Sequence, residues 1–285
     1  MVRRNFLQTA LMAASALFLA GCDAAFSALN LVVPRSGYRV VEGQAYGADP
    51  RQTLDVYVPD NLAAPAPVLL FFYGGAWQSG SRAQYRAFGQ AFASEGIVTV
   101  VADYRLYPQV TYPAFVADGA AALAWVQANI ARHGGDPARL FVSGHSAGGY
   151  IAAMLGAEPK FIEAVGGDPG WMRGIIGIAG PYDFMPLTEA SYIAIFHGAN
   201  NQGAMPVNHV TGKRPPMLLA WGAGDGTVGA ANIDHMEARL KSFGSVVETH
   251  RYPGVSHIGI ILSLAYGFRG RTTLHQDMLR FIRSH

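Results

Sequence analysis

The 285-residue sequence predicts an α/β fold with a mostly parallel central sheet and helices on both faces of that sheet. Strand-like and helix-like segments alternate along the chain, which is typical of a parallel sheet with crossover helices. Two strand-like runs, residues 68–72 and 97–101, are apolar except for Thr99, as expected of strands covered on both faces. In such a sheet, ligands bind at the carboxyl ends of the strands, so we expect the chemistry of this chain there.

The other elements are predicted from local patterns. Residues 53–58 alternate between apolar and polar side chains, which predicts a strand with one exposed face. Short apolar runs predict four more strands, around Leu140 and at residues 174–179, 217–221 and 246–252. Helices are expected at residues 82–93, 117–132, 147–155, 230–243 and 273–282.

The N-terminal segment resembles the export signal of a bacterial lipoprotein. Arg3 and Arg4 precede an apolar run at residues 11–20, which is too short to span a bilayer and is typical of a cleaved signal. The run leads through Leu-Ala-Gly to Cys22, which resembles a lipobox, and this resemblance implies that Cys22 is lipidated and anchors the chain to a membrane. The alternative is an ordinary secretory signal followed by a buried thiol.

These features divide the chain into a signal peptide (residues 1–21), a tether (22–36) and a folded domain (37–285) in the bacterial cell envelope, on the periplasmic or the outer face of a membrane. The Arg-Arg-Asn-Phe-Leu run resembles a twin-arginine signal and also fits the positive start of a Sec signal, so both export routes stay open. Asp23 resembles an inner-membrane retention signal of some bacteria, and the choice of membrane stays open as well.

The charge balance argues against nucleic-acid binding, and the cysteine content excludes disulfides within the domain. Residues 1–21 contain two arginines and no acidic residue, so their removal lowers Lys+Arg from 21 to 19, which balances 19 Asp+Glu. A formally neutral mature chain gives no support to nucleic-acid binding, which requires a clustered basic face. Since Cys22 is the only cysteine, no disulfide can form within the domain, and its stability must come from one large apolar core.

Residues 144–148 read Gly-His-Ser-Ala-Gly and lie between the apolar run 140–142 and a helix-forming stretch. A serine on a sharp strand-to-helix turn has a strained backbone and an exposed hydroxyl, and glycines two residues before and after it let the strand and the helix pack closely. An ordinary Gly/Ser turn is the alternative. In this context the pattern predicts that Ser146 is a nucleophile on an elbow.

A serine nucleophile needs a base within hydrogen-bond reach, and an acid must orient that base. Asp225 follows one late predicted strand in a glycine-rich turn, and His257 follows the next strand on a loop. Enzymes with this elbow carry the three groups in the chain order Ser, acid, His. We therefore predict a triad of Ser146, His257 and Asp225, with Asp234 as the alternative acid; His145, inside the elbow, is expected to point away from the hydroxyl.

Serine attack on a carbonyl creates an oxyanion, which backbone amides must stabilise. One donor is expected to be the amide of Ala147, directly after the nucleophile, and the other lies in the loop after the strand at residues 68–72. This loop reads Tyr-Gly-Gly-Ala-Trp, and its small residues let amides come close to a ligand. The second donor is predicted to be Gly75 or Ala76; a plain glycine turn is the alternative.

Together these motifs resemble the α/β-hydrolase superfamily and, within it, the esterase and kynurenine formamidase-like group with a His-Gly-Gly-x-Trp loop, which includes feruloyl-esterase-like proteins. The resemblance runs from about Tyr46 to His285. Its motifs are residues 54–57, 74–77, 103–106 with Pro108, 144–149, 180–183 and the loops of Asp225 and His257. It implies an α/β-hydrolase fold and acyl-enzyme chemistry that needs neither a metal nor an organic cofactor.

One position departs from the pattern, because Tyr73 stands where many relatives have histidine. That side chain usually supports the loop, so the oxyanion hole is expected to survive, but the assignment to the formamidase subgroup is weakened. The resemblance also implies that four charged residues are structural and pair below the site: Asp103, Arg105, Asp118 and Asp183.

Residues 184–215 form a long connection between two predicted strands, which is typical of a lid or a binding loop. We expect a small cap here that covers the serine and selects the acyl or alcohol group of the substrate. The alternative is a surface excursion without a role.

The sequence therefore predicts a serine carboxylic-ester hydrolase that acts on a small-molecule ester. Two alternatives stay open: an amide hydrolase of the arylformamidase or small-peptidase type, and a non-catalytic binding lipoprotein. No pattern in the sequence specifies the natural ester or the oligomeric state.

Overall fold

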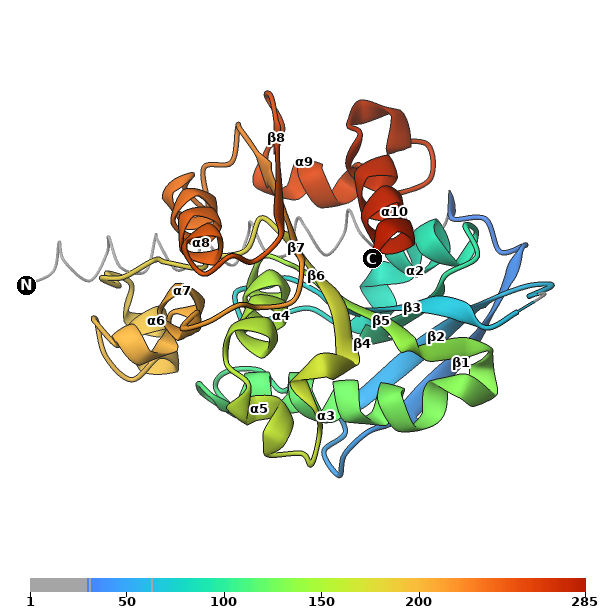
Figure 1. Ribbon diagram of the computed structural model, residues 1–285, viewed down its shortest axis with the longest axis horizontal. Coiled ribbons are helices and arrows are strands. Elements are labelled where there is room, and N and C mark those ends of the chain that lie inside the picture. Colours follow the sequence, from blue (N-terminus) through green and yellow to red (C-terminus); the bar gives the residue numbers. More distant parts are fainter. Residues whose placement is uncertain (1–29, 31, 63) are drawn as a thin grey trace, which may run out of the picture.

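The computed structural model describes residue 30, residues 32–62 and residues 64–285, and this part of the chain forms one eight-stranded sheet with helices around it (Figure 1). The strand order is β1-β2-β4-β3-β5-β6-β7-β8. β2 is antiparallel to both β1 and β4, and every other neighbouring pair is parallel, so the predicted mostly parallel sheet is confirmed. The strands are β1 (Tyr38–Ala45), β2 (Thr53–Pro59), β3 (Ala66–Phe72), β4 (Val98–Ala102), β5 (Gly135–His145), β6 (Met172–Ile178), β7 (Met217–Gly222) and β8 (Val247–Tyr252).

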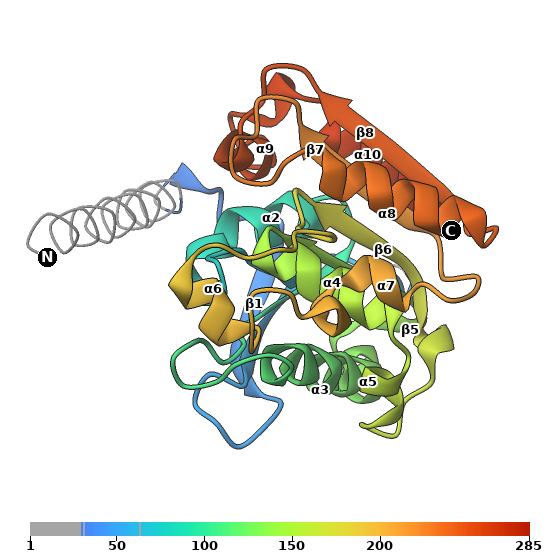
Figure 2. The ribbon, with the colours of Figure 1, turned by 90° about the vertical axis from the view of Figure 1, so that its left-hand side faces the viewer.

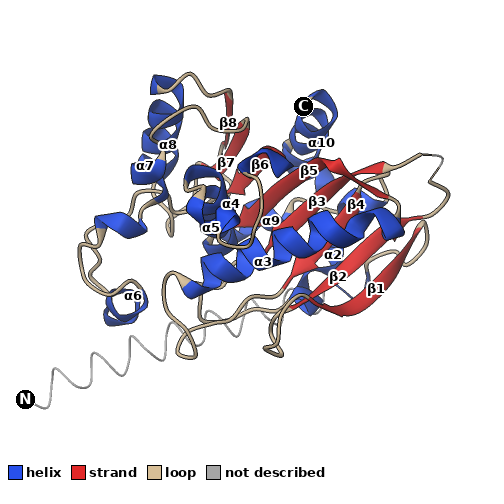
Figure 3. Cartoon of the chain, turned by 60° about the horizontal axis from the view of Figure 1, so that its bottom comes forward, coloured by secondary structure: helices blue, strands red, loops and turns tan. Residues whose placement is uncertain are grey.

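Helices cover both faces of the sheet. Successive side chains of a strand point to opposite faces, and the ring of Phe71 in β3 stacks on Phe88 at a centroid distance of 3.6 Å, whereas Phe72 lies under Gly119. α2 therefore covers one face and α3 the other, where α3 lies beside α4 (Figure 3). The helices are α2 (Arg86–Ala93), α3 (Ala114–Asn129), α4 (Ala147–Ala157), α5 (Lys160–Glu163), α6 (Ala190–Ile195), α7 (Pro206–His209), α8 (Ala231–Ser242), α9 (His257–Leu262) and α10 (Leu274–Ser284).

Short 3₁₀ turns connect or extend several of these elements. They are η1 (Arg82–Tyr85), η2 (Ile130–His133), η3 (Pro169–Trp171), η4 (Gln202–Ala204) and η5 (Arg269–Arg271). The predicted helix at residues 82–93 is therefore η1 followed by α2. α3 and η2 together are long and apolar enough to cross a membrane by composition alone, but half of this span is buried in the domain, where α3 packs on α4, α5 and the sheet, as a core helix does.

The predicted exposure of β2 is wrong. Its residues from Leu54 to Pro59 are all buried, because the strand lies inside the sheet between β1 and β4. Asp55, which suggested an exposed face, is buried with partners: its Oδ1 accepts a hydrogen bond from the Gly43 amide at 2.8 Å and from Nε of Arg82 at 2.8 Å. Asp55 therefore belongs to a buried ion pair with Arg82 and does not mark an exposed face of the strand.

The strand β1 was missed by sequence reasoning. It is the edge strand, and most of its side chains are exposed or half-buried, so it has no apolar run of its own. Its position comes from antiparallel pairing with β2.

The predicted signal peptide, the lipidated Cys22 and most of the tether lie outside the described residues. Within the described end of the tether, Asn30 Nδ2 donates to the carbonyl of Ala83 at 2.7 Å, and the buried side chain of Val33 packs with Ala87 and Ala265. The chain therefore joins the domain beside α2 and the C-terminal end of α9. In Figure 2, α9 lies with α8, α10, β7 and β8 at the top of the molecule, away from α3 at the bottom.

Candidate active site

Ser146 stands on a sharp turn between β5 and α4. Its backbone has φ 54° and ψ −121°, a conformation that costs a non-glycine residue about 1–3 kcal/mol and that is common at functional sites. A Cβ atom at Gly144 would lie 2.1 Å from the carbonyl oxygen of Gly148, and one at Gly148 would lie 2.0 Å from the carbonyl oxygen of Phe72. Both glycines are therefore required by close backbone packing, as the elbow pattern predicted.

The structure brings the three predicted triad residues together at the carboxyl ends of their strands. His257 Nε2 lies 2.9 Å from Ser146 Oγ, and His257 Nδ1 lies 2.7 Å from Asp225 Oδ2. Ser146 follows β5, Asp225 follows β7, and His257 is the first residue of α9 after β8. Ser146 is partly exposed, whereas His257 and Asp225 are buried, so the nucleophile is the most accessible of the three residues.

The carboxylate of Asp225 is held in its ionised form. Burial alone would raise the pKa of Asp225, but hydrogen bonds from His257, from the amide of Val228 at 2.9 Å and from the amide of Thr227 at 2.8 Å outweigh burial and lower it. An ionised carboxylate only accepts hydrogen bonds, so Nδ1 of His257 carries the proton toward Asp225. The lone pair of Nε2 then points to the hydroxyl of Ser146, as a general base requires.

The alternative acid, Asp234, is wrong on geometry. It lies on α8, where its Oδ1 is 2.6 Å from Nη2 of Arg251. The acid beside His257 is Asp225.

His145 is buried, and its side chain makes no hydrogen bond to the Ser146 hydroxyl. Its Nε2 lies 3.0 Å from the backbone oxygen of His257, a contact that sequence reasoning did not foresee. No local pattern could have shown this contact, because 112 positions separate the two residues.

The loop after β3 is packed directly against the elbow. A Cβ atom at Gly74 would lie 3.0 Å from the Cβ of Ser146, and the next three residues, Gly75, Ala76 and Trp77, all have positive φ angles, of 134°, 54° and 59°. Among the described residues, none accepts a hydrogen bond from the amides of Gly75, Ala76 or Ala147. These are the amides that the sequence predicted for the oxyanion hole, and they have donor capacity for a bound ligand.

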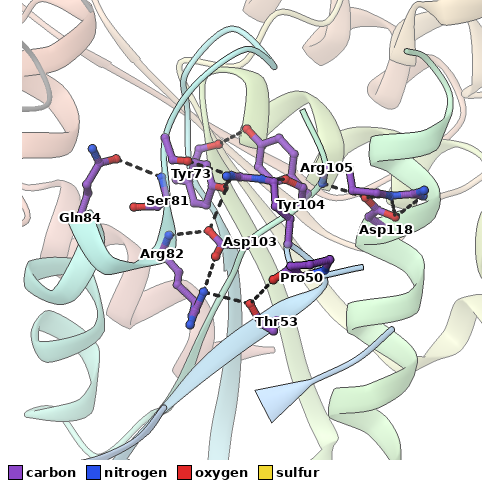
Figure 4. A network of polar contacts seen from close by, with 12 residues as sticks. Pro50, Thr53, Tyr73, Ser81, Arg82, Gln84, Asp103, Tyr104, Arg105 and Asp118 are labelled. Atoms are coloured by element: carbon purple, nitrogen blue, oxygen red, sulfur yellow. Dashed lines mark hydrogen bonds and ion pairs between the residues drawn. The ribbon is translucent and has the colours of Figure 1, made fainter. Parts of the chain in front are cut away.

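Arg51 and two tyrosines hold this loop in place, and Figure 4 shows the tyrosines, Tyr73 and Tyr104. Arg51 Nη2 donates to the hydroxyl of Tyr73 at 2.6 Å and to the carbonyl of Gly80 at 2.9 Å, so one guanidinium binds both ends of the loop. Tyr73 stacks on Tyr104 at 4.8 Å, and the Tyr104 hydroxyl donates to the Tyr73 carbonyl at 2.9 Å. Tyr73, the residue that departs from the family pattern, is thus itself a support of the loop.

The four charged residues that were expected to be structural have partners. Asp103 binds both the side chain and the amide of Arg82, and Asp118 Oδ1 lies 2.6 Å from Nη2 of Arg105. Asp183 Oδ2 lies 2.7 Å from Nδ1 of His235 on α8. Across the described residues, no group of three or more His, Cys, Asp or Glu side chains is arranged to hold a metal ion.

Residues 184–215, the predicted cap, contain α6, η4 and α7 and pack against the loop after β3. The indole of Trp77 makes edge contacts with the ring of Phe196 at 4.9 Å and with that of Tyr150 in α4 at 5.3 Å. The Tyr150 hydroxyl donates to the carbonyl of Ala204 at 2.7 Å, and the Tyr112 amide donates to the carbonyl of Ile195 at 2.9 Å. The segment therefore packs against Trp77, one residue after Ala76.

Solved structures share this architecture. Phosphonate-inhibited esterase B from Lactobacillus rhamnosis superposes with a TM-score of 0.82 over 97% of this chain and 95% of that chain at 20% identity, a likeness that shows the fold alone. Est2, an esterase from Thermogutta terrifontis, has a TM-score of 0.69 at 27% identity and covers 88% of this chain and 92% of its own.

Sequence comparisons agree with the fold. Esterase LipC from Mycobacterium tuberculosis is 32% identical over 74% of this chain and 58% of its own length. A probable isoprenylcysteine alpha-carbonyl methylesterase from Arabidopsis thaliana is 28% identical over 76% of this chain and 50% of its own. A similar methylesterase from rice is matched over 64% of its own length. The chain thus spans between half and two thirds of the length of these curated relatives. Residues 54–240 match the model of the BD-FAE family, and the chain therefore belongs to that family and has the α/β-hydrolase fold.

Proposed function

We propose that this protein is a serine carboxylic-ester hydrolase that works through an acyl-enzyme intermediate. The observation that carries the proposal is the continuous hydrogen-bonded line from Ser146 Oγ through His257 to Asp225, with distances of 2.9 and 2.7 Å. The names of its relatives, which include esterase LipC and a carboxylesterase of Mycobacterium tuberculosis, support an ester as the substrate.

The geometry defines a role for each group. Ser146 Oγ attacks the ester carbonyl carbon while His257 Nε2 takes the hydroxyl proton, and Asp225 stabilises the imidazolium that forms. The oxyanion of the tetrahedral intermediate accepts hydrogen bonds from the amides of Ala147 and of Gly75 or Ala76. His257 then gives its proton to the departing alcohol, and a water molecule repeats the sequence on the acyl-enzyme to release the acid and restore Ser146.

An ester is favoured over an amide as the substrate. The formamidase pattern carries a histidine before the two glycines, and here that position is Tyr73, which is engaged by Arg51 and Tyr104. The triad distances also argue against a purely binding protein, since a binding site requires no proton acceptor at 2.9 Å from a serine hydroxyl.

The proposed function is tested by the turnover of p-nitrophenyl acetate and of an aryl formamide between pH 5 and pH 8. We expect faster turnover of the ester and a kcat/KM that falls toward acid, because only the neutral imidazole of His257 can accept the serine proton. The lowered pKa of Asp225 keeps that carboxylate ionised throughout, so the carboxylate should add no ionisation of its own to the profile. A flat profile contradicts His257 as the base, and faster formamide turnover contradicts the ester assignment.

We further propose that the domain is held in the cell envelope by a lipid on Cys22. The Leu-Ala-Gly-Cys run after an apolar segment supports this, and residues 1–29 lie outside the described part of the chain. Mass spectrometry of the protein extracted from bacterial membranes is expected to find an acylated Cys22 as the first residue. An unmodified Cys22 within a longer mature chain would refute the anchor.

A further inference from the structure

His145 lies at the centre of the site and has no part in the mechanism above. It is the last residue of β5, directly before the nucleophile, and its side chain is 1% exposed. Its ring lies 4.9 Å from the ring of His257, and its Nε2 lies 3.0 Å from the His257 backbone oxygen. A Cβ atom added at Gly74 would lie 2.9 Å from His145 Nδ1, so the ring lies close to the loop after β3. One side chain thus lies against both His257 and the loop after β3.

The chemistry of these contacts determines the state of the ring. Burial, together with the nearby His257, lowers the pKa of His145 to about 3, so the ring is neutral at every pH at which an esterase of this kind is assayed. A carbonyl oxygen only accepts hydrogen bonds, so the single N–H of the neutral ring is on Nε2 and points to the His257 carbonyl.

The same state leaves Nδ1 of His145 with an unused lone pair. Nδ1 is buried and makes no hydrogen bond within the described part of the chain. A buried acceptor without a partner costs stability, and an apolar side chain of similar length would avoid that cost. The cost indicates that the Nε2–H contact to His257 supplies something that packing alone does not.

We propose that His145 is a positioning residue, which fixes the main chain of His257 and the loop at Gly74 at set distances from Ser146. This inference rests on the proposed esterase function. The hydrogen bond fixes the backbone of His257, whose side chain is the proposed base. The His145 ring fills the space between that base and the loop after β3. Catalysis by a serine and a base depends on their alignment, and a misplacement of about 1 Å can cost about a hundredfold in rate.

The test compares His145→Met with His145→Gln in the full-length protein, purified in detergent. Methionine has similar length but no donor, whereas the glutamine amide can place an N–H near the position of Nε2. We expect His145→Met to lower kcat for p-nitrophenyl acetate by about 10- to 100-fold with KM within about twofold, and to slow labelling of Ser146 by a fluorophosphonate equally. His145→Gln is expected to recover most of both rates.

The comparison of kcat between the two variants separates a positioning role from core packing. Because His145 is neutral, neither substitution removes a charge, so a change in kcat reports geometry. Equal kcat values for the two variants, whether at the wild-type level or equally lowered, would overturn the positioning role and leave His145 as core packing. If the methionine variant does not fold, His145→Asn replaces it, since its shorter amide cannot reach the carbonyl. Retained activity in Ser146→Ala would instead refute the esterase mechanism itself.

Discussion

Replacement of Ser146 by alanine is expected to lower kcat for p-nitrophenyl acetate by about 10⁴- to 10⁶-fold. The substitution removes the atom that attacks the carbonyl and leaves His257 Nε2 without the proton donor that now lies 2.9 Å away. The proposed oxyanion donors, the amides of Ala147 and of Gly75 or Ala76, remain, so a small residual rate above that of water is expected. Alanine fits the elbow at φ 54° about as well as serine, so the fold should persist and the loss should appear in kcat. Steady-state kinetics together with a thermal unfolding curve measure both quantities.

Ser143 provides the matched control. It lies three residues earlier in β5, is fully buried, and its hydroxyl has no hydrogen-bond partner among the described residues. Ser143→Ala is expected to keep kcat within about twofold, because the hydroxyl is buried and makes no hydrogen bond to a triad residue. Comparable kcat values for the two alanine variants would contradict the assignment of Ser146 as nucleophile.

Gly148→Ala is expected to destabilise the domain by about 3 kcal/mol or more, or to prevent folding. The new Cβ would lie 2.0 Å from the carbonyl oxygen and 2.4 Å from the carbonyl carbon of Phe72. These are backbone atoms of β3 in the middle of the sheet, so they cannot move aside as a flexible side chain could. Urea unfolding followed by circular dichroism measures the change in the free energy of unfolding.

Gly229→Ala is the control for that experiment. No atom lies within 4 Å of a Cβ at this position, and its φ is outside the left-handed region, so we expect a change of less than about 1 kcal/mol. If Gly148→Ala unfolds at the same urea concentration as Gly229→Ala, the close packing of the elbow on β3 does not limit stability in solution.

The parts that were predictable from sequence are those with a local signal. Strands β3 and β4 are almost entirely apolar, and the elbow has glycines at fixed spacing around Ser146. Asp225 and His257 could be chosen because each follows a predicted strand in the expected chain order. Because parallel strands end at the same edge of the sheet, the sequence also predicted that these side chains lie close together.

The parts that were missed depend on contacts between distant segments. β1 is polar along most of its length, and only its pairing with β2 identifies it as a strand. Arg51 donates to backbone carbonyls and to Tyr73, partners that leave no pattern in the sequence. The His145 contact to the His257 backbone is of the same kind. Contacts between a side chain and main-chain atoms that are distant in the sequence cannot be predicted from periodicity or motif spacing.

The packing of Trp77 against Phe196 and Tyr150 has a consequence for protein engineering. Trp77 follows Gly75 and Ala76, the proposed oxyanion donors. A smaller residue at position 196, introduced to admit bulkier esters, would therefore also free the indole and disturb the proposed donors. Gains in substrate range would then be offset by slower acylation. Libraries that vary positions 77, 150 and 196 together can restore the indole's support while reshaping the cover, whereas libraries that vary position 196 alone would mostly return slow enzymes.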